Sequence, residues 1–144
     1  MSTVSTTNIY SIFDEIVQPQ EDPNASGSLN DARGVGVSDV ELQAACTAVL
    51  PGGSFYNDHA GVLANALAYS LTADAITNGG PGQLSRVEIE GQCAKFAAYG
   101  LSLADVLATE ALIPLAAFNV FAFEPKIAYE PPILAYAQKD TPAS

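Results

Sequence analysis

The chain has 144 residues, which is enough for one domain with a hydrophobic core of its own. Hydrophobic residues make up 49% of it, so an acidic disordered protein is excluded. The net charge of −11 comes from 16 acidic residues against 5 basic ones. Because the bases are scattered along the chain, there is no cluster of Lys and Arg with which to bind nucleic acid.

Residues 1–37 read as an N-terminal arm that contains one short helix and a long loop. The first ten residues are rich in Ser and Thr and show no pattern of a regular element. Ser11 is a suitable cap for a short helix, and Pro19 would end that helix. Residues 18–37 mix Pro, Gly, Asn, Asp and Ser without periodicity, which predicts a loop.

Residues 38–123 predict a core domain of four to five helices, because helix-capping and helix-ending residues bound each apolar run. Two Ser-x-x-Glu capping boxes, at Ser38–Glu41 and Ser85–Glu88, each open one helix. The pattern favours a mostly α fold, either a small helical bundle or an orthogonal helical array. The alternative is a mixed fold with strands in the tail. The remaining expected elements are a long helix from Ser54 or Asn57 to Asn78, a helix capped by Ser102 with Asp105, and a short apolar segment, Leu115–Phe121, that follows a break at Ile113-Pro114 and has Pro114 in its first turn.

Residues 124–144 predict an extended arm, because prolines forbid a helix there while apolar side chains continue. Such a segment keeps its apolar side chains dry by lying on a surface, either its own core or a neighbouring subunit. We expect an interface made by the apolar residues of this arm, which are Ile127, Tyr129, Ile133, Leu134 and Tyr136.

The two cysteines, Cys46 and Cys93, both fall inside expected helices among small apolar residues. This setting is typical of buried free thiols that act as small hydrophobic side chains. A disulfide between them is the alternative, although two cysteines do not make a disulfide framework.

The sequence contains no recognisable catalytic or metal-binding motif. His59 is the sole histidine, and its neighbour Asp58 would point about 100° away from it on a helix. A histidine at a helix start is typical of a surface or capping residue, and a base also needs a nucleophile, which no motif identifies. The acid pairs Asp14-Glu15 and Glu21-Asp22 border loops, and Glu88 with Glu90 suits a helix N-terminus. We therefore expect no cofactor and no metal.

The chain offers no sign of export or membrane insertion. Its first residues lack a basic region followed by an apolar one, which a secretory signal needs. The apolar stretch from Ala111 to Phe123 is too short to span a bilayer, and Pro114 and Asn119 interrupt it. These features predict a cytoplasmic or virion protein.

The arms and the missing chemistry together favour a non-enzymatic structural subunit. It would pack against copies of itself or other protein subunits through its terminal arms, as a capsid, decoration or tail component of a virion does. One alternative is a small-molecule binder or carrier with an apolar pocket between helices. A third hypothesis is an enzyme that uses Asp58, His59 or a buried acid.

Overall fold

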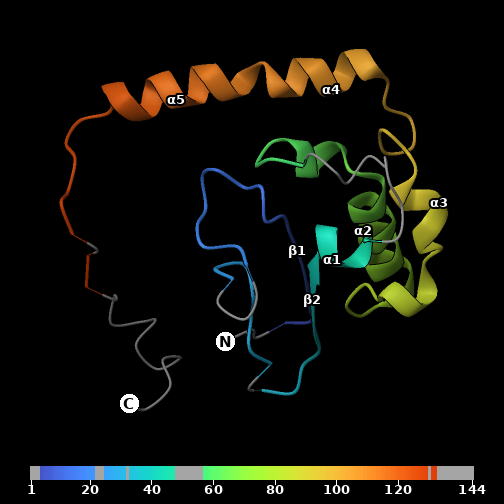
Figure 1. Cartoon of the computed structure of the whole chain (residues 1–144). Helices are drawn as coiled ribbons and strands as arrows, with labels where there is room; N and C mark the ends of the chain where they lie inside the picture. Colours follow the sequence, from blue (N-terminus) through green and yellow to red (C-terminus); the bar gives the residue numbers. More distant parts are fainter. Residues whose placement is uncertain (1–3, 22–24, 32, 48–56, 130, 133–144) are drawn as a thin grey trace.

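The computed structural model describes residues 4–21, 25–31, 33–47, 57–129 and 131–132. In these ranges the chain forms a two-stranded parallel sheet with helices beside it, and a long helix crosses the top of the molecule (Figure 1). The expectation of a mostly helical bundle is therefore wrong. The physical reason is that two segments far apart in the sequence pair as strands, which no local pattern reveals.

The sheet pairs β1 (Thr6–Tyr10) with β2 (Val37–Glu41) in parallel. The register places Thr6 opposite Val37 and Tyr10 opposite Glu41. Between the strands, the Asn8 amide donates a 2.9 Å hydrogen bond to Asp39 Oδ1. β1 thus occupies part of the expected N-terminal arm, and β2 occupies the first of the two predicted capping boxes.

Strand pairing outweighs the capping signal at Ser38–Glu41 because it buries an apolar side chain. Val40 on β2 is 3% exposed and joins the core. The helix that follows is only one turn, α1 (Leu42–Ala45), instead of the helix expected from Ser38 onward. Pro51, Gly52 and Gly53, which were expected to end that helix, lie outside the described residues.

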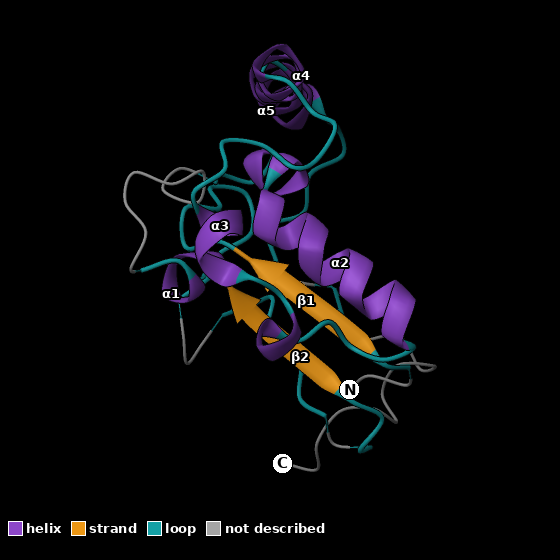
Figure 2. Ribbon diagram, turned by 90° about the vertical axis from the view of Figure 1, so that its right-hand side faces the viewer, coloured by secondary structure: helices purple, strands orange, loops and turns teal. Residues whose placement is uncertain are grey.

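The longest helix of the core is α2 (Ala66–Asn78), which lies along the sheet (Figure 2). Its start is set by Asn65, whose side chain accepts a 2.8 Å hydrogen bond from the Ala68 N–H. It ends at Gly79 in the left-handed conformation, as the sequence predicts. The expected long helix is therefore divided, because the 3-10 turn η1 (Gly61–Ala64) and Asn65 precede α2.

The core consists of side chains from the sheet and from α1, α2 and α3 (Ile89–Cys93). Leu67 and Leu71 of α2 are fully buried against Leu42 of α1. Each such burial stabilises the fold by about 1.5–3 kcal/mol. A short 3-10 turn, η2 (Leu84–Arg86), precedes α3, and the cap of α3 is the Glu88 side chain rather than that of Ser85.

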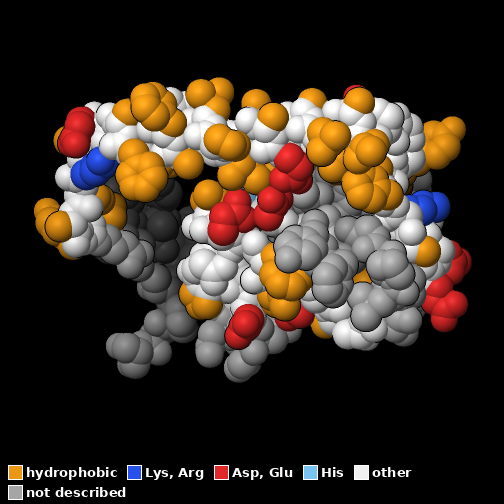
Figure 3. Space-filling model, turned by 45° about the horizontal axis from the view of Figure 1, so that its top comes forward, with side chains coloured by type: hydrophobic (Ala, Val, Ile, Leu, Met, Phe, Trp, Pro, Cys, Tyr) orange, Lys and Arg blue, Asp and Glu red, His pale blue; other side chains and the backbone are white. Residues whose placement is uncertain are grey.

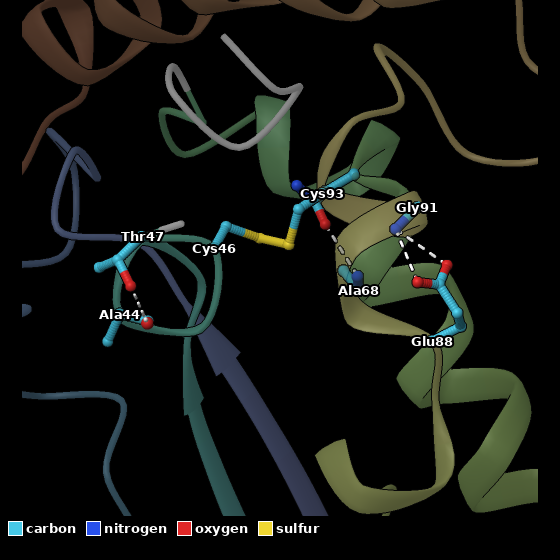
Figure 4. The surroundings of a disulfide bond; sticks show 8 residues. Ala44, Cys46, Thr47, Ala68, Glu88, Gly91 and Cys93 are labelled. Carbon is cyan, nitrogen blue, oxygen red and sulfur yellow. Dashed lines mark hydrogen bonds between the residues drawn. A yellow bond between two sulfur atoms is a disulfide. The ribbon is translucent and has the colours of Figure 1, made fainter. Parts of the chain in front are cut away.

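A disulfide joins Cys46, at the end of α1, to Cys93, at the end of α3 (Figure 4). Its Cα atoms lie 5.5 Å apart, and both residues are buried. The expectation of two free thiols is wrong. Their separation of 47 positions gave no sign that the fold would bring the two ends together.

The last helices, α4 (Leu103–Glu110) and α5 (Leu112–Ala122), form one nearly continuous rod (Figure 1). Ser102 and Asp105 make the expected capping box at its start. The interruption lies at Ala111 rather than at the expected Ile113-Pro114, and Pro114 lies in the first turn of α5, as expected, where its missing N–H costs no hydrogen bond. Lys126 caps the other end by donating a 2.6 Å hydrogen bond to the Phe121 carbonyl.

Two further expectations concern segments without helices. Residues 11–17 form turns instead of the short helix expected after Ser11. In the C-terminal arm, Ile127 and Tyr129 are exposed, while Ile133, Leu134 and Tyr136 lie outside the described residues. The interface expected from these five residues stays a prediction.

Candidate active site

The turn after β1 is held in place by a buried serine. The Ser11 hydroxyl donates to the Asn57 carbonyl and accepts a 2.8 Å hydrogen bond from the Gln43 amide. Gln43 also accepts from the Ile12 N–H at 3.0 Å. Three segments of the chain, the turn after β1, α1 and the irregular stretch before η1, are therefore joined at one point. This joint brings Asp14 close to His59.

Asp14 is buried and accepts hydrogen bonds with both carboxylate oxygens. Its Oδ1 accepts from the N–H groups of Ile16 and Val17 at 2.9 and 2.8 Å. Burial raises the pKa of Asp14, but the hydrogen bonds from Val17, His59 and Ile16 outweigh it, so the pKa lies below its usual value. The carboxylate is consequently ionised and fixed in orientation.

His59 is bound to this carboxylate through one ring nitrogen. The distance from His59 Nδ1 to Asp14 Oδ2 is 2.9 Å, and Asp14 is acceptor-only when ionised, so Nδ1 carries a proton. The backbone N–H of His59 donates a 3.1 Å hydrogen bond to Glu15 Oε2. Nε2 meets no hydrogen-bond partner among the described residues, and the His59 side chain is 49% exposed.

This arrangement gives the chemistry of an oriented general base. The carboxylate holds the imidazole in one tautomer and stabilises the imidazolium that forms when Nε2 takes a proton. It corresponds to two members of an acid–histidine–nucleophile triad. Within the part of the chain that the structure describes, no Ser, Thr or Cys hydroxyl or thiol bonds to His59. The described residues also contain no group of three or more His, Cys, Asp or Glu that could hold a metal.

His59 lines a cavity of about 320 Å³ whose other walls are mostly apolar. One wall is formed by residues before and within η1, and the opposite wall by α4 and α5. In Figure 3 hydrophobic side chains run along this helical rod, and acidic side chains gather in the crease beneath it. The lining residues are Glu15, Ile16, His59, Ala60, Val62, Leu63, Thr109, Leu112, Ile113 and Ala116.

A second carboxyl pair lies beside the histidine. Asp58 Oδ1 accepts a 2.7 Å hydrogen bond from the Gly61 N–H, and Glu110 of α4 lies near enough to Asp58 for the two carboxyl groups to interact. Burial, this interaction and the charge of Glu15 raise the pKa of Glu110 to about 7.

Comparison with solved structures provides a direct counterpart. The chain is similar to lipase B of Aspergillus fumigatus. The two are 43% identical over 94% of this chain, with a TM-score of 0.83. This chain spans 32% of the length of the lipase. No family model and no curated protein matches the chain.

This likeness overturns the expected function. A non-enzymatic structural subunit of a capsid, decoration or tail is wrong, because the chain resembles a lipase over nearly its whole length. The match is to a hydrolytic enzyme, and this chain has a mixed fold of parallel strands and helices rather than a helical bundle.

The sequence singled out His59 but gave it no acid partner, because its neighbour Asp58 was expected to point away from the imidazole. Asp58, its neighbour in sequence, bonds to Gly61, whereas the acid that meets the imidazole is Asp14, 45 positions earlier. The expected acid pair Asp14-Glu15 does serve the site, since each member bonds to His59. Asp14 could have been found as an acid that follows the end of a strand, but only if Thr6–Tyr10 had first been recognised as the strand β1.

The disulfide and the helical rod both bear on the location of the chain. The structure does not confirm a cytoplasmic or virion location, and the disulfide departs from what the reducing cytosol favours. By length and composition alone, the rod Leu103–Ala122 is apolar enough to cross a membrane, and none of it is buried inside the chain. Four residues of the rod line the same cavity as His59, and this favours the rod as a wall of the site over the rod as a membrane span.

Proposed function

We propose that this chain provides the acid and the base of a serine-type acyl hydrolase that cleaves esters with an apolar acyl group. The observation that carries the proposal is the 2.9 Å hydrogen bond between Asp14 Oδ2 and His59 Nδ1 at the wall of an apolar cavity. Asp14 orients the imidazole, and His59 takes the proton of the nucleophile and later passes it to the leaving alcohol.

The order of the two residues supports this assignment. In α/β-hydrolases the nucleophile comes first along the chain, then the acid and then the histidine. Asp14 precedes His59, which agrees with that order. We therefore expect the nucleophile, a serine, to come from polypeptide outside the described residues that packs against this unit.

The composition of the cavity supports the substrate class. Its walls carry Leu63, Leu112 and Ile113, which suit an acyl chain and offer no partner for a polar one. The ionised groups nearby are acidic, with Glu15 among the lining residues, so an anionic substrate would be repelled. A neutral ester fits both conditions.

The test replaces the matching third of Aspergillus fumigatus lipase B with this chain and measures hydrolysis of p-nitrophenyl octanoate. We expect a folded, active chimera. Asp14→Asn should lower kcat by about 10⁴, because an amide holds the wrong imidazole tautomer. His59→Gln should lower kcat at least as far, while Glu90→Gln, a surface change on α3, should leave it unchanged.

Two results would count against the proposal. One is a folded chimera without activity, and the other is an active chimera whose rate His59→Gln does not change. Should the chimera fail to fold, ¹⁵N shifts of His59 in the 144-residue chain give a second readout. The Nδ1-protonated tautomer should dominate and should lose its dominance in Asp14→Ala, and equal tautomers in both proteins would contradict the assignment.

The disulfide adds an expectation about location. Cys46–Cys93 would persist only in an oxidising environment, so we expect the enzyme to act outside the reducing cytosol. Alkylation of cells before lysis, followed by mass spectrometry, measures the fraction of Cys46 that is oxidised in the producing organism. A mostly reduced pair would contradict this location.

A further inference from the structure

Three hydrogen bonds join the segment that carries the acid to the segment that carries the base. The Ser11 hydroxyl donates to the Asn57 carbonyl. Asp14 Oδ2 accepts from the His59 ring, and Glu15 Oε2 accepts from the His59 main-chain N–H. The first of these bonds brings the two segments together, and the second orients the imidazole. The third, at Glu15, is the one that the proposed acid–base chemistry does not use.

The two carboxylates hold His59 at different atoms. The ring contact, from Nδ1 to Asp14 Oδ2, is 2.9 Å, and the main-chain contact, from the N–H to Glu15 Oε2, is 3.1 Å. The contact with Asp14 limits the rotation of the ring, but the ring also moves with the main chain that carries it. The contact with Glu15 limits that second movement. Each contact therefore restricts a motion that the other leaves free.

The main chain at His59 lies in a turn between an irregular stretch and η1. In helices and strands the N–H groups are paired within the element, but an N–H in a turn needs an acceptor from elsewhere. At His59 that acceptor is the Glu15 carboxylate. A charged acceptor makes a hydrogen bond roughly twice as strong as a neutral one does. Glu15 is thus well placed to fix this turn.

We propose that Glu15 is a positioning residue that fixes the main chain of His59, so that the imidazole stays at the cavity wall within reach of the nucleophile. Glu15 and His59 line the same cavity, so the contact lies where the proposed proton transfer takes place. The inference rests on the proposed function, because it concerns the base of that reaction. It adds that two consecutive residues, Asp14 and Glu15, hold this base at two points.

The role requires a hydrogen-bond acceptor at the reach of a glutamate side chain, which distinguishes it from a role of the negative charge. Glu15→Gln keeps the length and a carbonyl oxygen, so it should keep the contact and most of the function. Glu15→Asp keeps the charge but is one methylene shorter, so it should lose the contact. Glu15→Ala removes the acceptor and the charge together. Activity should therefore be highest in the wild type, then in Glu15→Gln, and lowest in Glu15→Asp and Glu15→Ala.

The first experiment measures hydrolysis of p-nitrophenyl octanoate by the lipase chimera. Glu15→Ala should lower kcat by about 10-fold, because a displaced base transfers the proton less well. KM should change by less than about 2-fold, because a carboxylate does not bind a neutral ester. Glu15→Gln should stay within about 3-fold of the wild-type kcat. The matched control is Glu21→Ala, which removes another exposed glutamate further along the chain and should leave kcat unchanged.

A double variant separates positioning of the base from general support of the fold. In Asp14→Asn the imidazole is already in the wrong tautomer, so fixing its main chain brings little further benefit. Glu15→Ala should therefore lower kcat by less than about 2-fold in the Asp14→Asn background, against about 10-fold in the wild type. A side chain that only stabilises the fold would cause the same fractional loss in both backgrounds, and that result would contradict the proposal.

Amide hydrogen exchange and ¹⁵N ring shifts of His59 in the 144-residue chain test the contact without turnover. The His59 amide should exchange about 10-fold faster in Glu15→Ala than in the wild type and in Glu15→Gln. The Nδ1-protonated tautomer should also lose part of its dominance in Glu15→Ala. This pattern supports the proposal even if the chimera is inactive, a result that would count against the hydrolase itself. Equal exchange in wild type and Glu15→Ala, or full kcat in a Glu15→Ala chimera, would overturn the proposal.

Discussion

Removing the Cys46–Cys93 disulfide should strongly destabilise the fold. The bond closes a loop of 47 residues that carries His59, η1 and α2. In the chain-entropy treatment, a loop of this length in the unfolded chain contributes about 4 kcal/mol to the free energy of unfolding. That is a large part of the roughly 5–15 kcal/mol by which domains are stable.

The assay is urea unfolding of wild type and of the double variant Cys46→Ala/Cys93→Ala, followed by circular dichroism. We expect the free energy of unfolding to fall by about 4 kcal/mol and the m value to rise, because the uncrosslinked chain exposes more surface when unfolded. The single variant Cys46→Ala should lose nearly as much as the double variant, since either change breaks the same bond.

Wild-type protein treated with dithiothreitol provides the matched control, because it keeps both sulfur atoms and loses only the bond. A loss of less than about 1 kcal/mol in the reduced protein would contradict the entropic account. A large loss in the double variant with a small one on reduction would instead assign the stability to packing of the buried sulfur atoms.

Three further predictions concern the core and the contacts around helix α2. Leu71→Ala should lower the free energy of unfolding by about 2–5 kcal/mol in urea melts, because Leu71 is fully buried, whereas Leu115→Ala on the exposed rod should change it by less than about 0.5 kcal/mol. Gly82→Ala should cost about 1–3 kcal/mol in the same melts, because a Cβ there would meet the Leu71 carbonyl, and Gly80→Ala, with open space around it, is the control. Hydrogen bonds from Arg86 hold the pKa of Asp74 below its ordinary 3.8. The stability that the ionised Asp74 contributes is therefore present above that value and is lost as pH falls through the lower pKa of the folded state. As pH is lowered from 5 to 2.5, the urea midpoint should fall less steeply in Asp74→Asn than in the wild type.

Features set by neighbouring residues were predictable from the sequence. The end of α2 at Gly79 and the capping box of Ser102 with Asp105 depend on hydrogen bonds within one turn, so their signals lie side by side in the chain. The same reasoning failed at Ser38–Glu41. There the stretch pairs with Thr6–Tyr10 as a strand, and the partner that decides its structure lies 31 positions away.

The candidate site was not predictable for a related reason. Asp14 and His59 meet because Ser11 joins the end of β1 to Asn57 and Gln43, and none of these contacts has a sequence period. The disulfide was unpredictable for the same reason, because Cys46 and Cys93 are 47 positions apart and each has the sequence surroundings of an ordinary core residue. Long-range pairs of this kind become visible only when the strands that bring them together are known.

The exposed apolar rod and the small sheet point to the same conclusion about how the unit works. Two parallel strands are too few for a stable sheet of their own, because parallel sheets are usually covered on both faces. A helix that is apolar all round is likewise usually covered by protein or lipid. The proposed acid and base, Asp14 and His59, are incomplete in the same sense, because no nucleophile bonds to His59 within the described residues. We therefore expect Nile red to bind the rod of the isolated chain and to lose most of that binding in the lipase chimera, where added polypeptide would cover the rod and bring the nucleophile to His59. Equal dye binding in a folded, active chimera would show that lipid or a second copy of the chain, not the rest of the hydrolase, covers the rod.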